Sequence, residues 1–253
     1  MEIKTLNERN IAEEHICCAI SDKKCLNGYN QKKNWLKKQF SKGYVFKKID
    51  VKHKVFIEYC PAEIAWASIE ANEYMFINCF WVAGSYKGKG FGKQLLSECI
   101  KDSKNKNGVL IISSDKKRPF LADKKFFLKN GFDVCDYAPP YFELLVKKNK
   151  SNAKSPKFKK VAKENICEDK KSLTVYYSDQ CPFTDYYVNI ELKEIAKNYG
   201  IPLKIIHIDT KEKAHAIPSA FGIHNVFYKG KFLTHELLTK KRFDNMWKEI
   251  KNI

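Results

Sequence analysis

A glycine-rich turn between an apolar run and a helical pattern constrains the fold more than any other stretch of this chain. The apolar run at residues 77–82 is interrupted only by Asn78 and predicts a largely buried strand. From residue 93 onward the apolar residues recur at helical spacing, so we expect a helix to begin at the glycines. The first turn of a helix has unpartnered N–H groups, and glycines let a phosphate approach them. The stretch therefore predicts a pyrophosphate-binding turn.

The register of the turn separates it from other phosphate-binding loops. Lys87, Gly90 and Gly92 give the pattern basic-x-x-Gly-x-Gly, whereas a P-loop needs Gly-Lys-Ser/Thr and a dinucleotide fingerprint needs G-x-G-x-x-G. With the strand before it and the helix after it, the stretch resembles motif A of the GNAT acetyltransferases, in which Arg or Gln is usual where Lys87 stands. The alternative is a glycine-rich hairpin turn before an ordinary helix.

The order of the expected elements supports the same resemblance. We expect helices at residues 11–20, 31–40, 93–100 and 123–131, and strands at 1–6, 44–50, 54–59, 65–69, 74–82, 108–113, 132–134 and 141–146. The element KKFFLKNGF at 124–132 is similar to the FYEKxGF-type element of the family. The resemblance implies the GNAT acyltransferase fold, an α/β (α+β) architecture with a mixed twisted sheet, over residues 1–148.

The resemblance also implies acetyl-CoA as co-substrate and a set of residues that hold it. Backbone groups of Phe80 and Val82 would hold the pantetheine arm, and the oxyanion would lie near the amides of that strand. The pyrophosphate would be held by Lys87, Gly88, Lys89, Gly90, Phe91, Gly92 and Lys93.

The catalytic residues are less well specified by the sequence. A general base in this family comes from a Glu or a water on the central strands, and Glu63 and Glu73 are candidates that could equally be loop carboxylates. The position at which many GNAT proteins place an acidic Tyr is Phe127, which cannot donate a proton. Tyr137 and Tyr141 lie downstream and are the candidates for a relocated acid.

Residues 149–171 differ in composition from the sequence on either side. They are rich in lysine and have almost no apolar periodicity, which predicts a basic linker or a peripheral arm. We therefore expect a domain at 1–148 and a second at 172–253 that share little apolar surface and fold independently.

The second domain has the pattern βαβαββα with Cys181 after its first strand, and it resembles thioredoxin. A cysteine at a helix N-terminus has a lowered pKa, which makes Cys181 a possible redox thiol. Thr184 stands where a resolving cysteine would be, and a proline before the third strand is missing, so a binding scaffold is an equal alternative. Together with EHICCAI, KVFIEYCPAEIAW, KGKGFG and KRPFLADKKFF, the chain resembles GNAT proteins that carry a C-terminal YoaP-like domain.

Composition limits the other classes of function. The net charge is +18, but all but three of the 47 basic residues are lysine, whereas specific nucleic-acid binding favours arginine, so we do not expect a nucleic-acid partner. Early Glu2 and Lys4 argue against a signal peptide, and no apolar stretch is long enough to span a membrane. The nine cysteines have no zinc-ligand spacing and indicate reduced thiols in a cytoplasmic protein.

These observations predict an acetyl-CoA-dependent N-acetyltransferase joined to a thioredoxin-like module. The acceptor is an amine on a small molecule or a protein, which attacks the thioester directly in a ternary complex. The alternative is a thiol redox or partner-binding protein whose first domain only binds acyl-CoA.

Overall fold

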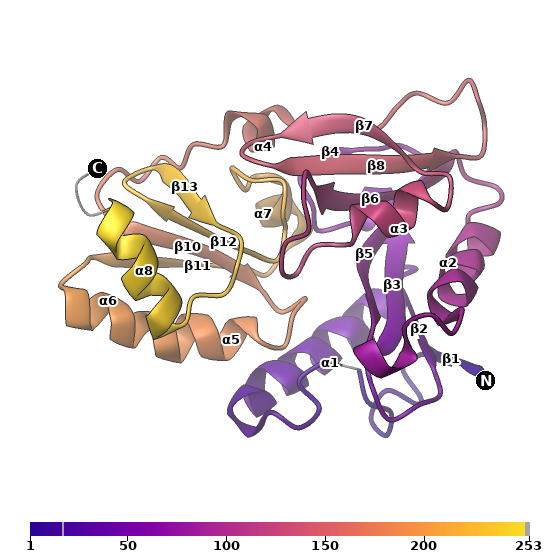
Figure 1. Cartoon of the computed structure of the whole chain (residues 1–253), viewed down its shortest axis with the longest axis horizontal. Coiled ribbons are helices and arrows are strands. Elements are labelled where there is room, and N and C mark those ends of the chain that lie inside the picture. The colour runs from indigo at the N-terminus through magenta and orange to yellow at the C-terminus, as the bar shows by residue number, and fades with distance from the viewer. Residues whose placement is uncertain (17, 251–253) are drawn as a thin grey trace.

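The computed structural model describes residues 1–16 and 18–250, which form two neighbouring β-sheets with helices packed around each and a short two-stranded sheet (Figure 1). The larger sheet has seven strands in the order β1-β2-β3-β5-β6-β8-β7. Its strands are β1 (Ile3–Leu6), β2 (Val45–Ile49), β3 (Val55–Pro61), β5 (Tyr74–Val82), β6 (Gly108–Ser114), β7 (Asp133–Ala138) and β8 (Phe142–Lys148). Only β5 and β6 run parallel, so the sheet is mixed, as the sequence predicted.

Helices cover both faces of the larger sheet. The buried side chains of α1 (Leu26–Phe40), among them Trp35 and Leu36, pack into one core. On the opposite face, α2 (Phe91–Asp102) and α3 (Lys124–Leu128) bury Leu95, Leu96 and Phe127 in a second core. Short 3₁₀ turns precede α1, follow β3 and follow β5, at η1 (Lys23–Cys25), η2 (Ala62–Ile64) and η3 (Gly84–Tyr86).

The expected strand, glycine turn and helix at residues 74–102 are confirmed, and so is the cap of α3. The side chain of Asp123 accepts a hydrogen bond from the N–H of Lys125, which begins that helix. Both features depend on residues close together in the sequence.

The helix expected at residues 11–20 is wrong. The described part of this segment is turns, with Cys17 outside the described residues. Its polar side chains are drawn to distant partners: Glu14 forms ion pairs with Lys4 and Lys48, and His15 contacts the carbonyl of Val51. These contacts hold the chain in a path that a regular helix would not follow.

The smaller sheet has four strands in the order β11-β10-β12-β13. Its strands are β10 (Leu173–Ser178), β11 (Leu203–Ile208), β12 (His224–Tyr228) and β13 (Lys231–Thr234). Strand β10 is parallel to β11 and antiparallel to β12, and β12 and β13 form a hairpin. The expected βαβ unit and closing hairpin are therefore present.

One face of this smaller sheet is covered by a long helical segment and the last helix. The segment runs through α5 (Thr184–Tyr186), the π-helical η4 (Tyr187–Leu192) and α6 (Lys193–Tyr199), and α8 (Lys240–Ile250) packs beside it. The helix expected over 211–220 is shorter, at α7 (Lys211–His215). Residues after α7, including Ala220 and Phe221, join the core of the larger sheet, so the two sheets share one apolar core.

The expectation that residues 149–171 share little apolar surface is wrong. Strand β9 (Lys157–Phe158) pairs with β4 (Ile69–Glu70), and α4 (Lys160–Glu164) follows it. The side chains of Phe158 and Ala162 are fully buried in the shared core. Burial of these two apolar side chains holds the lysine-rich segment against the core. The strand partner of Phe158 is Ile69, almost ninety residues earlier in the chain.

Within the described residues, no helix combines the length and the apolar character needed to cross a bilayer.

Candidate functional site

The two parallel strands at the middle of the larger sheet separate halfway along their length. Pairing between β5 and β6 is confined to residues 74–77 and 108–111, although β5 continues to Val82 and β6 to Ser114. Beyond Ile77, one edge of β5 therefore has no neighbouring strand within the described structure. An open strand edge in the middle of a sheet offers backbone donors and acceptors to an extended ligand.

The register of β5 shows which residues face the open edge. The N–H of Ala83 donates to the carbonyl of Lys54, the residue just before β3, at 2.7 Å. Because the N–H and C=O groups of successive residues point to alternate sides of a strand, the backbone groups of Val82 and Phe80 point the other way. The two residues that the sequence assigned to a pantetheine arm thus present their backbone groups to the gap.

The glycine turn continues from this open edge. Gly88 and Gly90 have φ values of +76° and +83°, and a Cβ placed on either would have no atom within 4 Å. Gly90 caps α2, whose first turn contains no acidic residue, and Lys87, Lys89 and Lys93 are exposed around it. Open space, unpartnered helix N–H groups and three ammonium groups fit a phosphate-bearing ligand.

Gly92 and Phe91 have a different part in the turn. A Cβ on Gly92 would lie 3.2 Å from the ring of Phe126 and 3.3 Å from that of Phe80. Gly92 therefore allows α2 to lie close to α3 and β5. Phe91 is half-buried, and its ring centre lies 6.0 Å from that of Tyr86. This contact joins the two ends of the turn.

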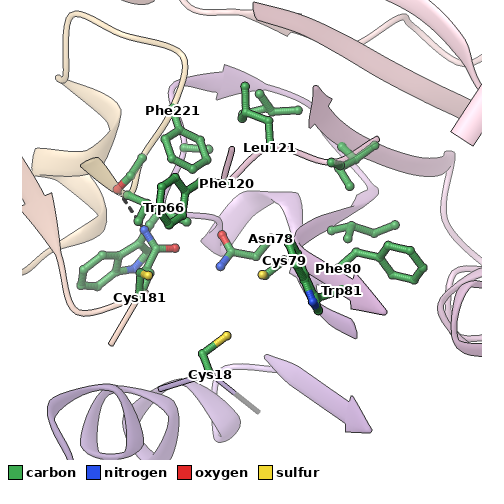
Figure 2. Close-up of a pocket in the computed structure, with 18 of the residues that line it drawn as sticks. Cys18, Trp66, Asn78, Cys79, Phe80, Trp81, Phe120, Leu121, Cys181 and Phe221 are labelled. Carbon is green, nitrogen blue, oxygen red and sulfur yellow. Dashed lines mark hydrogen bonds between the residues drawn. The ribbon is translucent and has the colours of Figure 1, made fainter. Parts of the chain in front are cut away.

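A β-bulge changes which side chains of β5 face each core. Glu58 of β3 is opposite Cys79 and Tyr59 is opposite Ile77, so Asn78 is the extra residue. Before the bulge Phe76 faces the core that contains α1, and after it Cys79 does. Both Asn78 and Cys79 consequently line the same cavity (Figure 2). The Nδ2 atom of Asn78 is buried and has no hydrogen-bond partner, which leaves a donor for a bound ligand.

The cavity lies between the two sheets and has a volume of about 260 Å³. Its walls come from β5 and β6 where they separate, from the loop before α3, and from the loop after β10 and the segment before β12 of the smaller sheet. The other lining residues are Cys18, Lys32, Lys54, Phe56, Trp66 and Ala67. Figure 2 shows Trp66, Phe120 and Phe221 gathered on one side and Cys18, Cys79 and Cys181 facing the space.

The three thiols of the cavity are kept protonated. Burial raises the pKa of Cys18 to about 12, and burial also raises the pKa of Cys79 and of Cys181. The N–H of Phe183 donates to Cys181, which opposes the effect without reversing it. The structure does not support the lowered pKa expected for Cys181, because burial between the two sheets opposes the effect of a helix N-terminus.

A buried ion pair borders the cavity next to these thiols. The ammonium of Lys32, on α1, lines the cavity and donates to the Glu58 carboxylate, which also accepts from the Tyr44 hydroxyl at 2.8 Å. Burial alone would lower the pKa of Lys32, but the Glu58 carboxylate outweighs it and the pKa is raised. Lys32 is thus a charged donor at the cavity wall.

The carboxylates considered as bases lie elsewhere. Glu63 accepts a hydrogen bond from the backbone N–H of Glu73 at 2.6 Å, and both are exposed at the start of β5. The glycine turn follows the other end of that strand, and neither carboxylate lines the cavity. The geometry does not support the prediction that Glu63 or Glu73 is a general base.

Tyr141, the candidate acid, and Phe127, which stands at the usual position of that acid, also lie outside the cavity. Tyr141 donates to Nδ1 of His235 at 2.7 Å, and the guanidinium of Arg118 lies 3.7 Å from its ring centre. Burial raises the pKa of Tyr141 to about 12. Phe127 is fully buried among other rings. Tyr141 therefore joins the two sheets, which does not support the prediction that it is an acid.

Sequence reasoning missed Lys32, Glu58, Asn78 and the aromatic wall. A signal existed for two of them, because Glu58 and Asn78 are polar residues inside apolar strand runs. Trp66 and Phe120 gave no signal, since they lie in irregular segments.

Comparisons with known proteins identify relatives of both parts of the chain. The model of the acetyltransferase (GNAT) family matches residues 10–132, and the YoaP-like model matches residues 202–245. The N-acetyltransferase YoaP of Bacillus subtilis (strain 168), itself uncharacterized, is 40% identical over 243 residues, which are 95% of this chain and 96% of that protein.

Part of this chain is also similar in structure to solved proteins. The PaiA N-acetyltransferase from Thermoplasma acidophilum, in complex with coenzyme A, is 19% identical with a TM-score of 0.39, over 58% of this chain and 99% of that one. The putative streptothricin acetyltransferase from Bacillus anthracis, in complex with acetyl coenzyme A, is 15% identical with a TM-score of 0.33. The match covers 42% of this chain and 62% of that one.

Proposed function

The chain belongs to the GNAT family of N-acetyltransferases, and from this premise we propose that it transfers the acetyl group of acetyl-CoA to an amine by direct attack in a ternary complex. Acetyl-CoA is the co-substrate of this family. The observation that carries the proposal is the open edge of β5, which leads from the cavity to the glycine turn.

Acetyl-CoA would lie along this path. The pyrophosphate contacts the N–H groups at the start of α2 and the ammonium groups of Lys87, Lys89 and Lys93. The pantetheine arm extends along the backbone of Val82 and Phe80. This places the thioester beside Asn78 and Cys79, at the point where β5 and β6 separate.

The chemistry then needs an oxyanion donor and a neutral amine. We assign the donor role to Nδ2 of Asn78, the buried group without a partner. No Asp or Glu is found among the described residues that line the cavity, so the amine enters uncharged or loses its proton to water. The nitrogen attacks the carbonyl carbon, the C–S bond breaks, and the CoA thiolate takes up a proton from solvent.

The second domain, residues 172–253, is proposed to be a thioredoxin-like scaffold without redox activity. The strand order β11-β10-β12-β13, with one parallel pair, supports the fold. Thr184 donates to the carbonyls of Ser178 and Cys181 in the place of a resolving cysteine. With the pKa of Cys181 raised by burial, the alternative of a thiol redox protein is less well supported.

The test is a two-part measurement on the purified full chain. Calorimetric titration should detect acetyl-CoA binding, and mass spectrometry should detect an N-acetyl product when a panel of primary amines is supplied. Absence of acetyl-CoA binding would refute the proposal. Binding of acetyl-CoA without transfer to any amine would favour the alternative, in which the first domain only binds acyl-CoA.

A further inference from the structure

Seven of the 25 described residues that line the cavity come from the second domain. The loop after β10 contributes Gln180, Cys181 and Phe183, and the segment before β12 contributes Phe221 and Gly222. Opposite them lie the separating strands of the first domain (Figure 2). An amine that reaches the thioester through this cavity must contact both domains.

The second domain is held against the first by close backbone contacts on two sides of the cavity. A Cβ on Gly222 would lie 1.8 Å from the carbonyl oxygen of Trp66, and a Cβ on Gly28 of α1 would lie 2.2 Å from that of Pro182. At such distances only glycine fits. The ammonium of Lys54 also lies 5.6 Å from the ring centre of Phe183, across the domain boundary. These contacts hold the walls of the cavity from the two domains next to each other.

The side chains of the wall specify the chemistry of an occupant. They are mostly aromatic or aliphatic, with Trp66, Phe76, Phe120 and Phe221 among them. The only charged side chains among the described lining residues are Lys32 and Lys54, both cationic. A ligand with a second positive charge would lose its hydration and meet like charge there.

The loop before α3 adds a sign of local strain. Phe120 has a φ of +64°, which is uncommon for a residue other than glycine, and its side chain is 41% exposed. Its ring lines the cavity, as do those of Trp66 and Phe221 (Figure 2). Residues with a strained backbone are often found at catalytic and ligand-binding sites.

We propose that the second domain completes the acceptor pocket, and that the acceptor is a small aromatic primary amine with a single amino group. This inference rests on the proposed acetyl transfer. The volume of about 260 Å³ suits a small molecule rather than a protein segment. In the reaction the amine nitrogen gains the acetyl group and loses one proton, and CoA leaves as the free thiol.

The experiment compares matched amines with the full chain and acetyl-CoA. The probes are 2-phenylethylamine and tryptamine, against 1,4-diaminobutane and spermidine, with the N-acetyl product measured by mass spectrometry. We expect kcat/KM for the aromatic monoamines to exceed that for the polyamines at least about tenfold, since the polyamines place a second cation beside the lysines.

Variants separate the pocket from the acetyl-CoA site. Phe120→Ala should reduce kcat/KM for the aromatic amine about tenfold, while acetyl-CoA affinity by calorimetry stays unchanged. Leu128→Ala is the control, because Leu128 is also 41% exposed and lies on α3 outside the cavity. Leu128→Ala should change neither kcat/KM for the aromatic amine nor the affinity for acetyl-CoA.

The outcomes distinguish this inference from the proposed function. Faster acetylation of the polyamines, or no effect of Phe120→Ala on the aromatic amines, would overturn the acceptor assignment and leave acetyl transfer intact. Acetylation of a free peptide N-terminus in preference to every aromatic amine would also overturn it. A chain that does not bind acetyl-CoA at all would refute both.

Discussion

Gly90 combines a left-handed backbone with the position of the expected pyrophosphate. Its φ is +83° and the space above it is open. Gly90→Asp should abolish acetyl-CoA binding, because a carboxylate would occupy the anion position, whereas Gly90→Ala should weaken binding less, through backbone strain alone. Lys87→Ala should weaken binding by about 1–2 kcal/mol, as expected for a charge-assisted contact at an exposed site.

Calorimetric titration of acetyl-CoA measures both effects. Lys104→Ala is the control for charge, since Lys104 is an exposed lysine just beyond the C-terminal end of the same helix. Equal losses for Lys87→Ala and Lys104→Ala would mean that only the overall charge of the protein matters. Retained binding in Gly90→Asp would place the pyrophosphate elsewhere.

Asn78 carries the buried donor that we assign to the oxyanion. Asn78→Ala should lower kcat by about 10²-fold, in the range measured for the loss of one oxyanion donor. Acetyl-CoA affinity should change little, because the contact strengthens only as charge develops on the oxygen. Steady-state kinetics and titration on the same preparation test this. A loss of affinity that matches the loss in kcat would indicate a ground-state contact instead.

Cys181 provides a separate test of the redox alternative. Because burial raises the pKa of its thiol, alkylation at neutral pH should be slower than for a free cysteine, and the apparent pKa should exceed about 8.5. The rate of iodoacetamide labelling against pH, with Cys181→Ser to subtract the other thiols, gives this value. An apparent pKa below that of free cysteine would restore the redox interpretation.

At the scale of elements, close spacing in the sequence decided what could be predicted. The unit of β5, glycine turn and α2 was predictable because its apolar spacing, glycines and lysines lie within 30 residues. Strand β9 was not predictable. Phe158 is buried where β9 pairs with β4, and nothing near Phe158 in the sequence indicates that partner. The acceptor pocket was missed for the same reason, since its walls come from segments between residues 18 and 223.

Two glycines between elements of different domains make the docking testable. Gly222→Ala and Gly28→Ala should each lower the free energy of unfolding by about 1–3 kcal/mol, because the added methyl groups would meet backbone carbonyls that cannot move aside. Gly84→Ala is the control, with no atom within 4 Å of its Cβ and no left-handed φ. Urea unfolding measures the change, and equal stability of all three variants would contradict close docking.

For the whole molecule, two histidines of the second domain join it to the first as neutral groups. Nε2–H of His235 donates to the carbonyl of Pro119 at 2.8 Å, so its Nδ1 accepts from Tyr141. Nε2–H of His215 donates to the carbonyl of Ala65 at 3.0 Å, and its Nδ1 accepts from Lys159. Burial lowers the pKa of His235 to about 4, and burial also lowers the pKa of His215.

These lowered pKa values make the docked chain sensitive to acid. An unfolded histidine has a pKa of about 6.5, so between that pH and about 4 the unfolded state binds more protons than the folded one. The contribution of these histidines to the free energy of unfolding is therefore fully present above about pH 6.5 and is lost as the pH falls through this window. For His235 alone the loss is on the order of 3 kcal/mol.

The prediction is that the urea midpoint falls between pH 7 and pH 4.5, and that His235→Gln reduces the slope. The slope should not vanish, because His224 is buried in the second domain and burial lowers its pKa to about 4 as well. His53→Gln is the control, since His53 is exposed in a loop and should leave the slope unchanged. A slope in His235→Gln equal to that of the unchanged chain would mean that acid acts at other groups. A flattened slope would assign part of the acid sensitivity to His235 and its contact with Pro119.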